Sequence, residues 1–174
     1  ELQQLHLSEK RYRSLFEQSL QAIGIHSPDD GLLEANSAWV ELWGITVEET
    51  VPYYVLEDPQ LVELGIMPDI ERVFTGEPVS PPTVCFDSGR SIKGQRTRWV
   101  QTNMYPVKDE ADNVREVVII HQDVTELKQA EQLAQERAEA LQQRTLELAE
   151  VNAVLSRSLS QLTDQTDLDT FLGQ

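Results

Sequence analysis

A run of β-branched residues passes into a long helix-forming segment with no glycine or proline between them. Residues 117–120 read VVII, which is typical of a buried strand. From Glu126 onward the chain is rich in Leu, Ala, Glu, Gln, Lys and Arg, which favour helices. Because Gly and Pro mark most turns, their absence predicts a strand that continues directly into a helix. This junction strongly limits the folds open to the chain.

Beyond the junction, a seven-residue spacing of apolar residues predicts a coiled coil. A helix over 126–163 would be too long for a domain of this size to cover, so we expect it to pair with a second copy. The predicted seam of a parallel homodimer contains Leu127, Ala134, Leu141, Leu148, Asn152 and Leu155. Asn152 occupies the other core position of the heptad, where Asn fixes a two-stranded register. A single helix stabilised by charge pairs four residues apart is the alternative.

Charge and composition exclude several classes of function. The net charge is −16, from 14 Lys and Arg against 30 Asp and Glu. Surfaces that bind nucleic acid or anionic lipid need clustered basic residues, so we expect neither partner. We also expect no membrane segment, because no apolar run is long enough. The single cysteine, Cys85, cannot form an internal disulfide, which favours a cytoplasmic setting.

The pattern before the junction predicts an α+β domain over 21–125. The expected elements are a flanking helix over 1–20, a hairpin over 22–35, short helices between 36 and 76, and strands over 83–87, 96–107 and 114–123. Strands joined by hairpins on either side of a helical stretch form an antiparallel sheet with helices on one face. Because the chain begins with Glu1 rather than Met, we expect it to be part of a longer protein.

Capping residues predict the bounds of the short helices. Asn36 is a preferred N-cap, and Gly44 stands where a helix would end. Thr46 and Glu49 fit a capping box at the start of another helix. Asp58 is expected to cap a third helix, with proline at its first position. The middle of the domain is therefore predicted to be a series of separately capped helices.

Several segments, in this order, resemble a PAS domain. LLEANSAWVELWG resembles the segment in which a strand ends at an Asn that caps a helix closing on Gly. RVFTGEPV resembles the passage from helix to strand, and WVQTNMYPVKDEADNVREVVIIHQDVTELKQAE resembles the last two strands with the exit signature Asp123-Val124-Thr125. The resemblance covers residues 8–130 and implies a five-stranded antiparallel sheet, short helices on one face, an N-terminal helix and a long C-terminal helix. Residues 164–174 resemble the start of a GAF domain.

The resemblance implies a sensory and dimerisation module of a multidomain signalling protein, such as a histidine kinase of a two-component system. A change in the PAS core would pass through Asp123 and Thr125 to the coiled coil, and from there to an effector domain in the same chain. We expect no enzymatic activity, because no nucleophile with a base and no paired carboxylates stand out. A structural spacer that binds no ligand and only joins subunits is the alternative function.

Alternation along the strands predicts which side chains face a small-molecule ligand. The expected ligand-contacting residues are His121, Thr102, Met104, Val100, Trp39 and Trp43. By position, His121 resembles a polar residue that contacts the flavin ring in light-sensing PAS relatives. A histidine satisfied by backbone groups at the rim of the core is the other interpretation. The two tryptophans are equally consistent with ordinary core packing.

The motifs support no particular cofactor. Light-sensing relatives place a reactive Cys in an N-C-R-F-L-Q helix, and the chain has no such motif. Haem-binding relatives place a His on the helix before the third strand, and residues 58–76 contain none. Acidic residues over 57–71 lack the spacing of a calcium loop, so we expect no metal. Cys85 lies on a predicted strand and is expected to be a small buried side chain.

Overall fold

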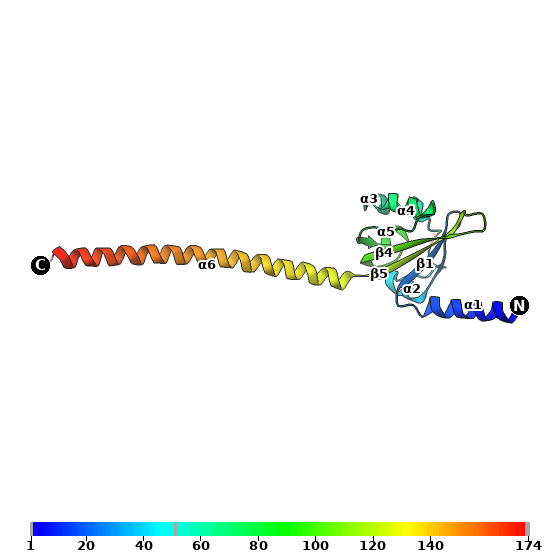
Figure 1. Cartoon of the computed structure of the whole chain (residues 1–174), viewed down its shortest axis with the longest axis horizontal. Helices are drawn as coiled ribbons and strands as arrows, with labels where there is room; N and C mark the ends of the chain where they lie inside the picture. The colour runs from blue at the N-terminus through cyan, green and yellow to red at the C-terminus, as the bar shows by residue number, and fades with distance from the viewer. Residues whose placement is uncertain (1, 51, 173–174) are drawn as a thin grey trace. The chain divides into compact units, whose positions relative to one another are not determined.

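The computed structural model describes residues 2–50 and 52–172, and of residues 163–172 it describes the backbone alone. The chain divides into two compact units, residues 1–126 and residues 127–174 (Figure 1). Within the described part of the chain, no helix is long and apolar enough to cross a membrane.

A five-stranded antiparallel sheet forms the first unit, with the strand order β2-β1-β5-β4-β3. The strands are β1 (Ala22–Ser27), β2 (Gly31–Ala35), β3 (Val84–Asp87), β4 (Thr97–Lys108) and β5 (Val114–Asp123). β5 pairs with both β1 and β4, so the last strand is the central one (Figure 1). All five strands were predicted from the sequence, as was their α+β arrangement.

Short helices cover one face of this sheet, as the order of strands and helices predicted. They are α2 (Ser37–Trp43), the 3-10 helix η1 (Val55–Glu57), α3 (Pro59–Glu63), α4 (Met67–Phe74) and α5 (Ser88–Ser91). Asn36 caps α2 by accepting from the Trp39 N–H, and Gly44 ends it in the left-handed conformation at φ 71°. Asp58 caps α3 by accepting from the Gln60 N–H.

Asn36 also holds three segments together from a fully buried position. Its Oδ1 accepts from the N–H groups of Ile23 and Trp39, each at 2.9 Å. Its Nδ2 donates to the carbonyl oxygens of Phe16 and Gln21, each at 2.9 Å. The end of α1 (Leu2–Glu17), the start of β1 and the first turn of α2 therefore meet at one side chain.

Two local predictions differ from the structure. Thr46 and Glu49 form both bonds of a capping box, but no helix follows them. Residues 47–49 form a turn instead. The segment predicted as the loop after β3 begins with the one-turn helix α5. It forms because Asp87 accepts from the Gly89 N–H and caps it.

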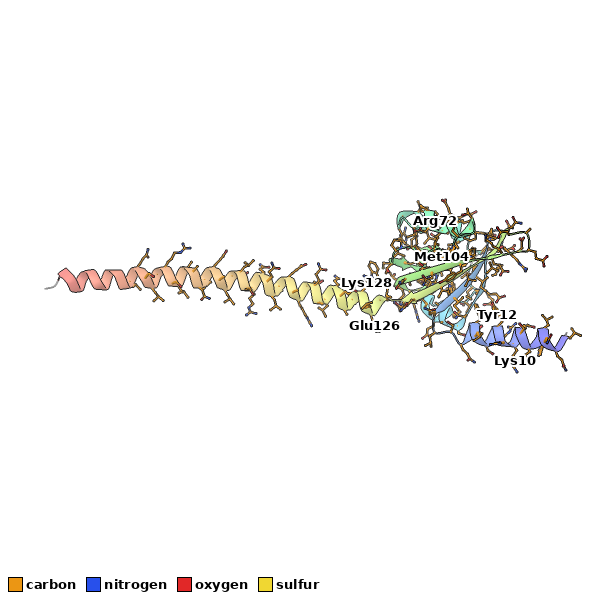
Figure 2. All side chains as sticks on the ribbon, in the orientation of Figure 1. Lys10, Tyr12, Arg72, Met104, Glu126 and Lys128 are labelled. Carbon is orange, nitrogen blue, oxygen red and sulfur yellow. The ribbon has the colours of Figure 1, made fainter. Side chains whose placement is uncertain are left out.

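The inner face of the sheet forms the core together with the helices. Val100, Thr102 and Met104 of β4 are all at most 5% exposed, whereas Trp99 and Tyr105 lie on the outer face, as alternation predicted. β5 contributes its own inward residues, and Ile70 and Val73 of α4 complete the opposite side of the core. Figure 2 shows Met104 within this part of the molecule.

The prediction that Cys85 is buried is wrong. It pairs across the strands with Trp99, so it lies on the outer face of the sheet and is half-buried. Its neighbours on β3 face inward instead, because successive side chains of a strand point to opposite faces.

The second unit is the greater part of one helix, α6 (Thr125–Leu172). This helix continues past 163, where the predicted coiled coil was to end. All the predicted seam residues are exposed, from Leu127 to Leu155. Figure 2 shows side chains standing off α6 around the helix. The predicted start of a further domain at 164–174 is backbone helix as far as Leu172, and its last two residues lie outside the described residues.

Candidate functional site

A cavity of about 50 Å³ lies between the inner face of the sheet and the helices. Most of its lining is apolar, and its polar groups belong to two histidines, a tyrosine, a threonine and the indole N–H groups of two tryptophans. All the residues predicted to contact a ligand line this one cavity: His121, Thr102, Met104, Val100, Trp39 and Trp43. The structure therefore brings these residues together, and whether a ligand binds there stays a prediction.

His121 is bonded to a side chain inside the cavity. Its Nδ1 lies 3.0 Å from Oγ1 of Thr102, the residue directly opposite on β4. Its ring meets that of Trp43 edge-on, with the centroids 5.4 Å apart. Burial lowers the pKa of His121 to about 4, so the ring is neutral at neutral pH. A threonine, rather than the backbone groups considered from the sequence, satisfies this histidine.

His26 is a second histidine of the cavity, and the sequence reasoning missed it. It is 3% exposed, and its Nδ1 has no hydrogen-bond partner in the described part of the structure. Burial, and then the nearby His121, lower the pKa of His26 to about 3. The signal was present, because alternation in AIGIHS places His26 on one face of a strand with Gly24.

Gly24 makes room for the rings at this end of the cavity. A Cβ atom at this position would lie 3.3 Å from both His26 Nε2 and Trp39 Nε1. Tyr53 also lines the cavity, and its hydroxyl donates to Asp58 Oδ2 at 2.7 Å. Burial, and then Asp58, raise the pKa of Tyr53 well above its ordinary value. The sequence reasoning missed Tyr53, because no strand or helix pattern surrounds it.

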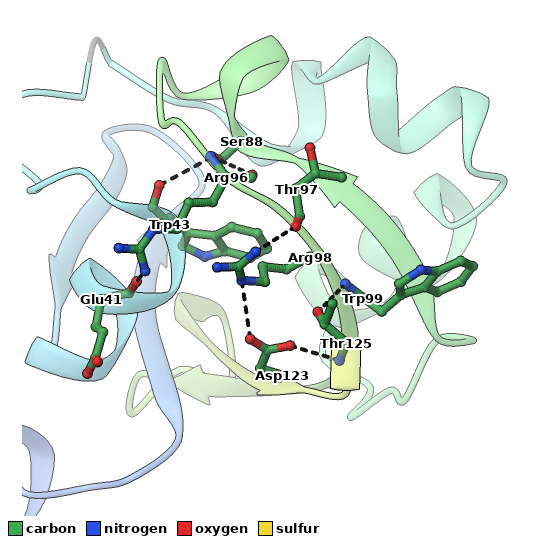
Figure 3. A network of polar contacts seen from close by, with 9 residues as sticks. All are labelled: Glu41, Trp43, Ser88, Arg96, Thr97, Arg98, Trp99, Asp123 and Thr125. Atoms are coloured by element: carbon green, nitrogen blue, oxygen red, sulfur yellow. Dashed lines mark hydrogen bonds and ion pairs between the residues drawn. The ribbon is translucent and has the colours of Figure 1, made fainter. Parts of the chain in front are cut away.

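The exit junction joins the end of β5 to the start of α6. Asp123 Oδ1 accepts from the Thr125 N–H at 2.9 Å, and its Oδ2 lies 3.4 Å from Arg98 Nε. Thr125 Oγ1 accepts from the Trp99 N–H at 3.0 Å, and the Val124 N–H donates to the Trp99 carbonyl at 2.9 Å. Figure 3 shows the contacts that link Arg98 and Trp99 to Asp123 and Thr125.

This network differs from the capping box that the sequence indicated between Asp123 and Glu126. None of the described hydrogen bonds returns from Glu126 to Asp123. Because α6 begins at Thr125, the N-cap position is Val124, and Asp123 precedes it by one residue. Asp123 therefore accepts from the Thr125 N–H and not from the Glu126 N–H. The backbone of Trp99 on β4 makes the further contacts at the start of the helix, with Thr125 Oγ1 and with the Val124 N–H. The first turn of the helix is thus attached to the neighbouring strand as well as to its own.

A surface groove of about 410 Å³ lies beside the junction. Arg96, Arg98 and Asp123 line one part of it, and α2 lines another. Arg96 donates to the Glu41 carbonyl, which ties the residue before β4 to α2 (Figure 3). His121 is the residue that lines both this groove and the internal cavity. It therefore separates the interior from the surface, two residues before the junction.

The lining of the cavity combines neutral imidazoles with apolar and aromatic walls, which is the usual composition of a small-molecule pocket. Among the described residues, no three His, Cys, Asp or Glu side chains are grouped so that they could hold a metal ion.

A five-stranded antiparallel sheet with short helices over one face, followed by a long helix, defines a class of small α+β domains. The family model described as "PAS fold" matches residues 16–129. The chain therefore belongs to the PAS family, a family of sensory domains. Comparison with curated proteins gives no match.

Solved structures share this fold at low identity. An RNA-binding light-oxygen-voltage receptor is 21% identical with a TM-score of 0.57, over 77% of this chain and 38% of that one. A domain of a sensory box sensor histidine kinase/response regulator from Geobacter sulfurreducens is 21% identical with a TM-score of 0.51, over 68% of this chain and 96% of that one. The Rhodobacter sphaeroides LOV protein is 10% identical with a TM-score of 0.52, over 68% of each chain.

Proposed function

We propose that the chain senses a molecule in the PAS cavity and relays its presence through the exit junction to a dimeric coiled coil. One observation carries this proposal: His121 lines the cavity and stands two residues before Asp123 on the same strand. A molecule that displaces His121 would therefore act on the strand end that holds α6.

The contacts between β4 and β5 supply a route for this relay. His121 and Thr102 join the two strands inside the cavity, and Trp99 and Thr125 join them to the helix at the exit. The backbone pairing of Val100 with Asp123 lies between these two points. A shift of β5 along β4 would thus change both the His121–Thr102 contact and the Trp99–Thr125 contact. Two alternative positions of β5 would provide the two states that signalling requires.

The second part of the proposal is a parallel homodimer through α6. Leucines at one heptad position are more than half exposed, including Leu141 at 67% and Leu148 at 58%. Such a stripe is stabilised when a second helix covers it. The polar core positions Glu131, Thr145 and Asn152 would keep the pair from locking into one arrangement. An effector domain after α6, as in a sensor histidine kinase, would receive the change.

Disulfide crosslinking tests the dimer. In a Cys85→Ser background, Leu141→Cys and Leu148→Cys are expected to form symmetric crosslinks, because each lies on the predicted seam. Gln143→Cys is the matched control, since it lies on the far side of the same helical turn. Equal crosslinking at Gln143 and Leu141, or none at either seam position in folded protein, would reject the parallel coiled coil.

A ligand-free spacer is a second candidate, and the small size of the cavity favours it. About 50 Å³ is a modest space, so much of the core is already filled by the protein's own side chains. In this case the domain would only join subunits and position a neighbouring effector domain. Native mass spectrometry separates the two functions: a retained small molecule supports the sensor, and uniformly ligand-free protein supports the spacer.

A further inference from the structure

His26 lines the cavity, and its ring carries a polar atom that the protein itself does not satisfy. His26 is 3% exposed, and its Nδ1 is the buried side-chain atom without a hydrogen bond among the described residues. Three other polar side chains of the cavity are engaged, since Tyr53 donates to Asp58 and His121 is bonded to Thr102. Folded proteins rarely leave a buried polar group unpaired, because the group loses its bonds to water and gains none in return.

The lining of the cavity disfavours a charged occupant. No Asp, Glu, Lys or Arg is found among the described residues that line it. A charged molecule would lose its hydration there without gaining an opposite charge, which is strongly unfavourable. Both histidines are neutral near neutral pH, because burial opposes their protonation. Each neutral ring offers one hydrogen-bond donor and one acceptor.

The volume of the cavity sets an upper limit on the size of a bound molecule. A water molecule needs roughly 10–15 Å³ of such volume, and an engineered cavity of about 150 Å³ binds benzene. The cavity measures about 50 Å³. It therefore has room for a molecule of about three to five non-hydrogen atoms. Flavin and haem are both far larger than this.

We infer that the cavity binds a small uncharged molecule with a hydrogen-bonding group, and that His26 is its polar anchor. This inference rests on the proposed sensor function and names the chemical class of its ligand. The molecule would reach the cavity from the surface groove at His121, the residue common to both. A ligand held by His26 would lie among the apolar side chains of the lining, which include Trp39.

Nitrogen NMR of the imidazole rings tests the ligand class on the whole chain. Isopropanol is the probe, acetate is an anionic molecule of the same number of heavy atoms, and xenon is an apolar one. Isopropanol should shift the His26 ring nitrogens in a saturable way at concentrations that leave the circular dichroism spectrum unchanged. Acetate should not. In His26→Phe, which keeps a ring but removes both nitrogens, isopropanol should bind about tenfold more weakly, as the loss of one hydrogen bond predicts.

Three results would overturn the inference. They are equal effects of acetate and isopropanol, no shift at His26 in wild-type protein with any probe, and equal isopropanol affinity in wild type and His26→Phe. If His26→Phe does not fold, the wild-type comparison of isopropanol with acetate still decides. The proposed relay is tested separately. A ligand that acts on the junction should shift the NMR signal of the Thr125 amide, and the crosslinks at Leu141 and Leu148 test the dimer. Xenon binding that moves the Thr125 signal while isopropanol leaves His26 unchanged would reject the ligand class and retain the sensor.

Discussion

His121 Nδ1 and Thr102 Oγ1 lie 3.0 Å apart, so β4 and β5 are joined by a side-chain bond within the cavity as well as by their backbones. The same two strands hold the first turn of α6 through Trp99 and Asp123. The cavity and the exit junction therefore belong to one pair of strands.

Replacing Thr102 with valine is expected to destabilise the domain by about 1–2 kcal/mol. Valine has nearly the same shape, but it leaves His121 Nδ1 without its partner inside the core. Urea unfolding measures the loss. Thr102→Ser retains the hydroxyl and is the control, so it should lose less than Thr102→Val. Equal losses would show that packing, rather than the hydrogen bond, matters at this position.

Asp123→Ala is expected to loosen the start of α6 at a cost of about 1 kcal/mol, as for the loss of a helix cap. The Thr125 amide, which donates to Asp123 at 2.9 Å, should exchange with solvent faster. Asp123→Asn retains an acceptor oxygen and should protect that amide nearly as well as wild type. The ion pair with Arg98 is partly exposed and adds little. Unchanged exchange in Asp123→Ala would mean that Trp99 alone holds the junction.

Acid should destabilise the folded domain before most of its carboxylates are protonated. The folded pKa values of His26 and His121 are about 3 and about 4, below the ordinary value of 6.5. Between the folded pKa of each histidine and 6.5, the unfolded chain therefore binds more protons than the folded one. The free energy of unfolding rises with pH over this range. Stability should fall as the pH drops from 6.5 toward 4, by at most about 1.4 kcal/mol per pH unit for each histidine.

The slope of that pH dependence can be assigned to a residue by urea unfolding at several pH values. His26→Phe should flatten it more than His121→Phe, because His26 is almost fully buried whereas His121 retains partial exposure beside the groove. A wild-type stability that does not change between pH 6.5 and 4.5 would contradict the burial of neutral rings.

Asn36→Ala is expected to be the most damaging single polar substitution, with a loss of about 2–4 kcal/mol. It removes two accepted and two donated bonds at a fully buried site. Asn36→Asp keeps the acceptor for the Trp39 N–H but cannot donate to Phe16 and Gln21, so it should remain clearly destabilised. Thermal unfolding measures both. A loss below about 1 kcal/mol in Asn36→Ala would show that water replaces the amide.

Local sequence signals determined much of the fold. The caps Asn36 and Asp58 act through backbone groups within a few residues, so their helices could be predicted from short stretches. Alternation similarly placed Thr102 and Met104 on the inner face, because neighbouring side chains of a strand point to opposite sides. The exit signature correctly located the junction between β5 and α6.

The errors occurred where a contact between distant residues decides the outcome. Cys85 is half-buried because its strand pairs with β4 in a register that puts it beside Trp99. Asp123 bonds Thr125 rather than Glu126, because Trp99 of another strand fixes the start of the helix. No local pattern contains either fact.

By itself, the sequence determined the α+β class, the strand order along the chain and the continuous helix, because periodicity, capping and turn chemistry are local properties. Only the tertiary structure decided that His26 and His121 share one cavity, with one ring nitrogen satisfied by Thr102 and another unpaired. The reason is that β1 is far from β4 and β5 in the chain and meets them only through sheet pairing with β5. Which buried groups find partners depends on that pairing.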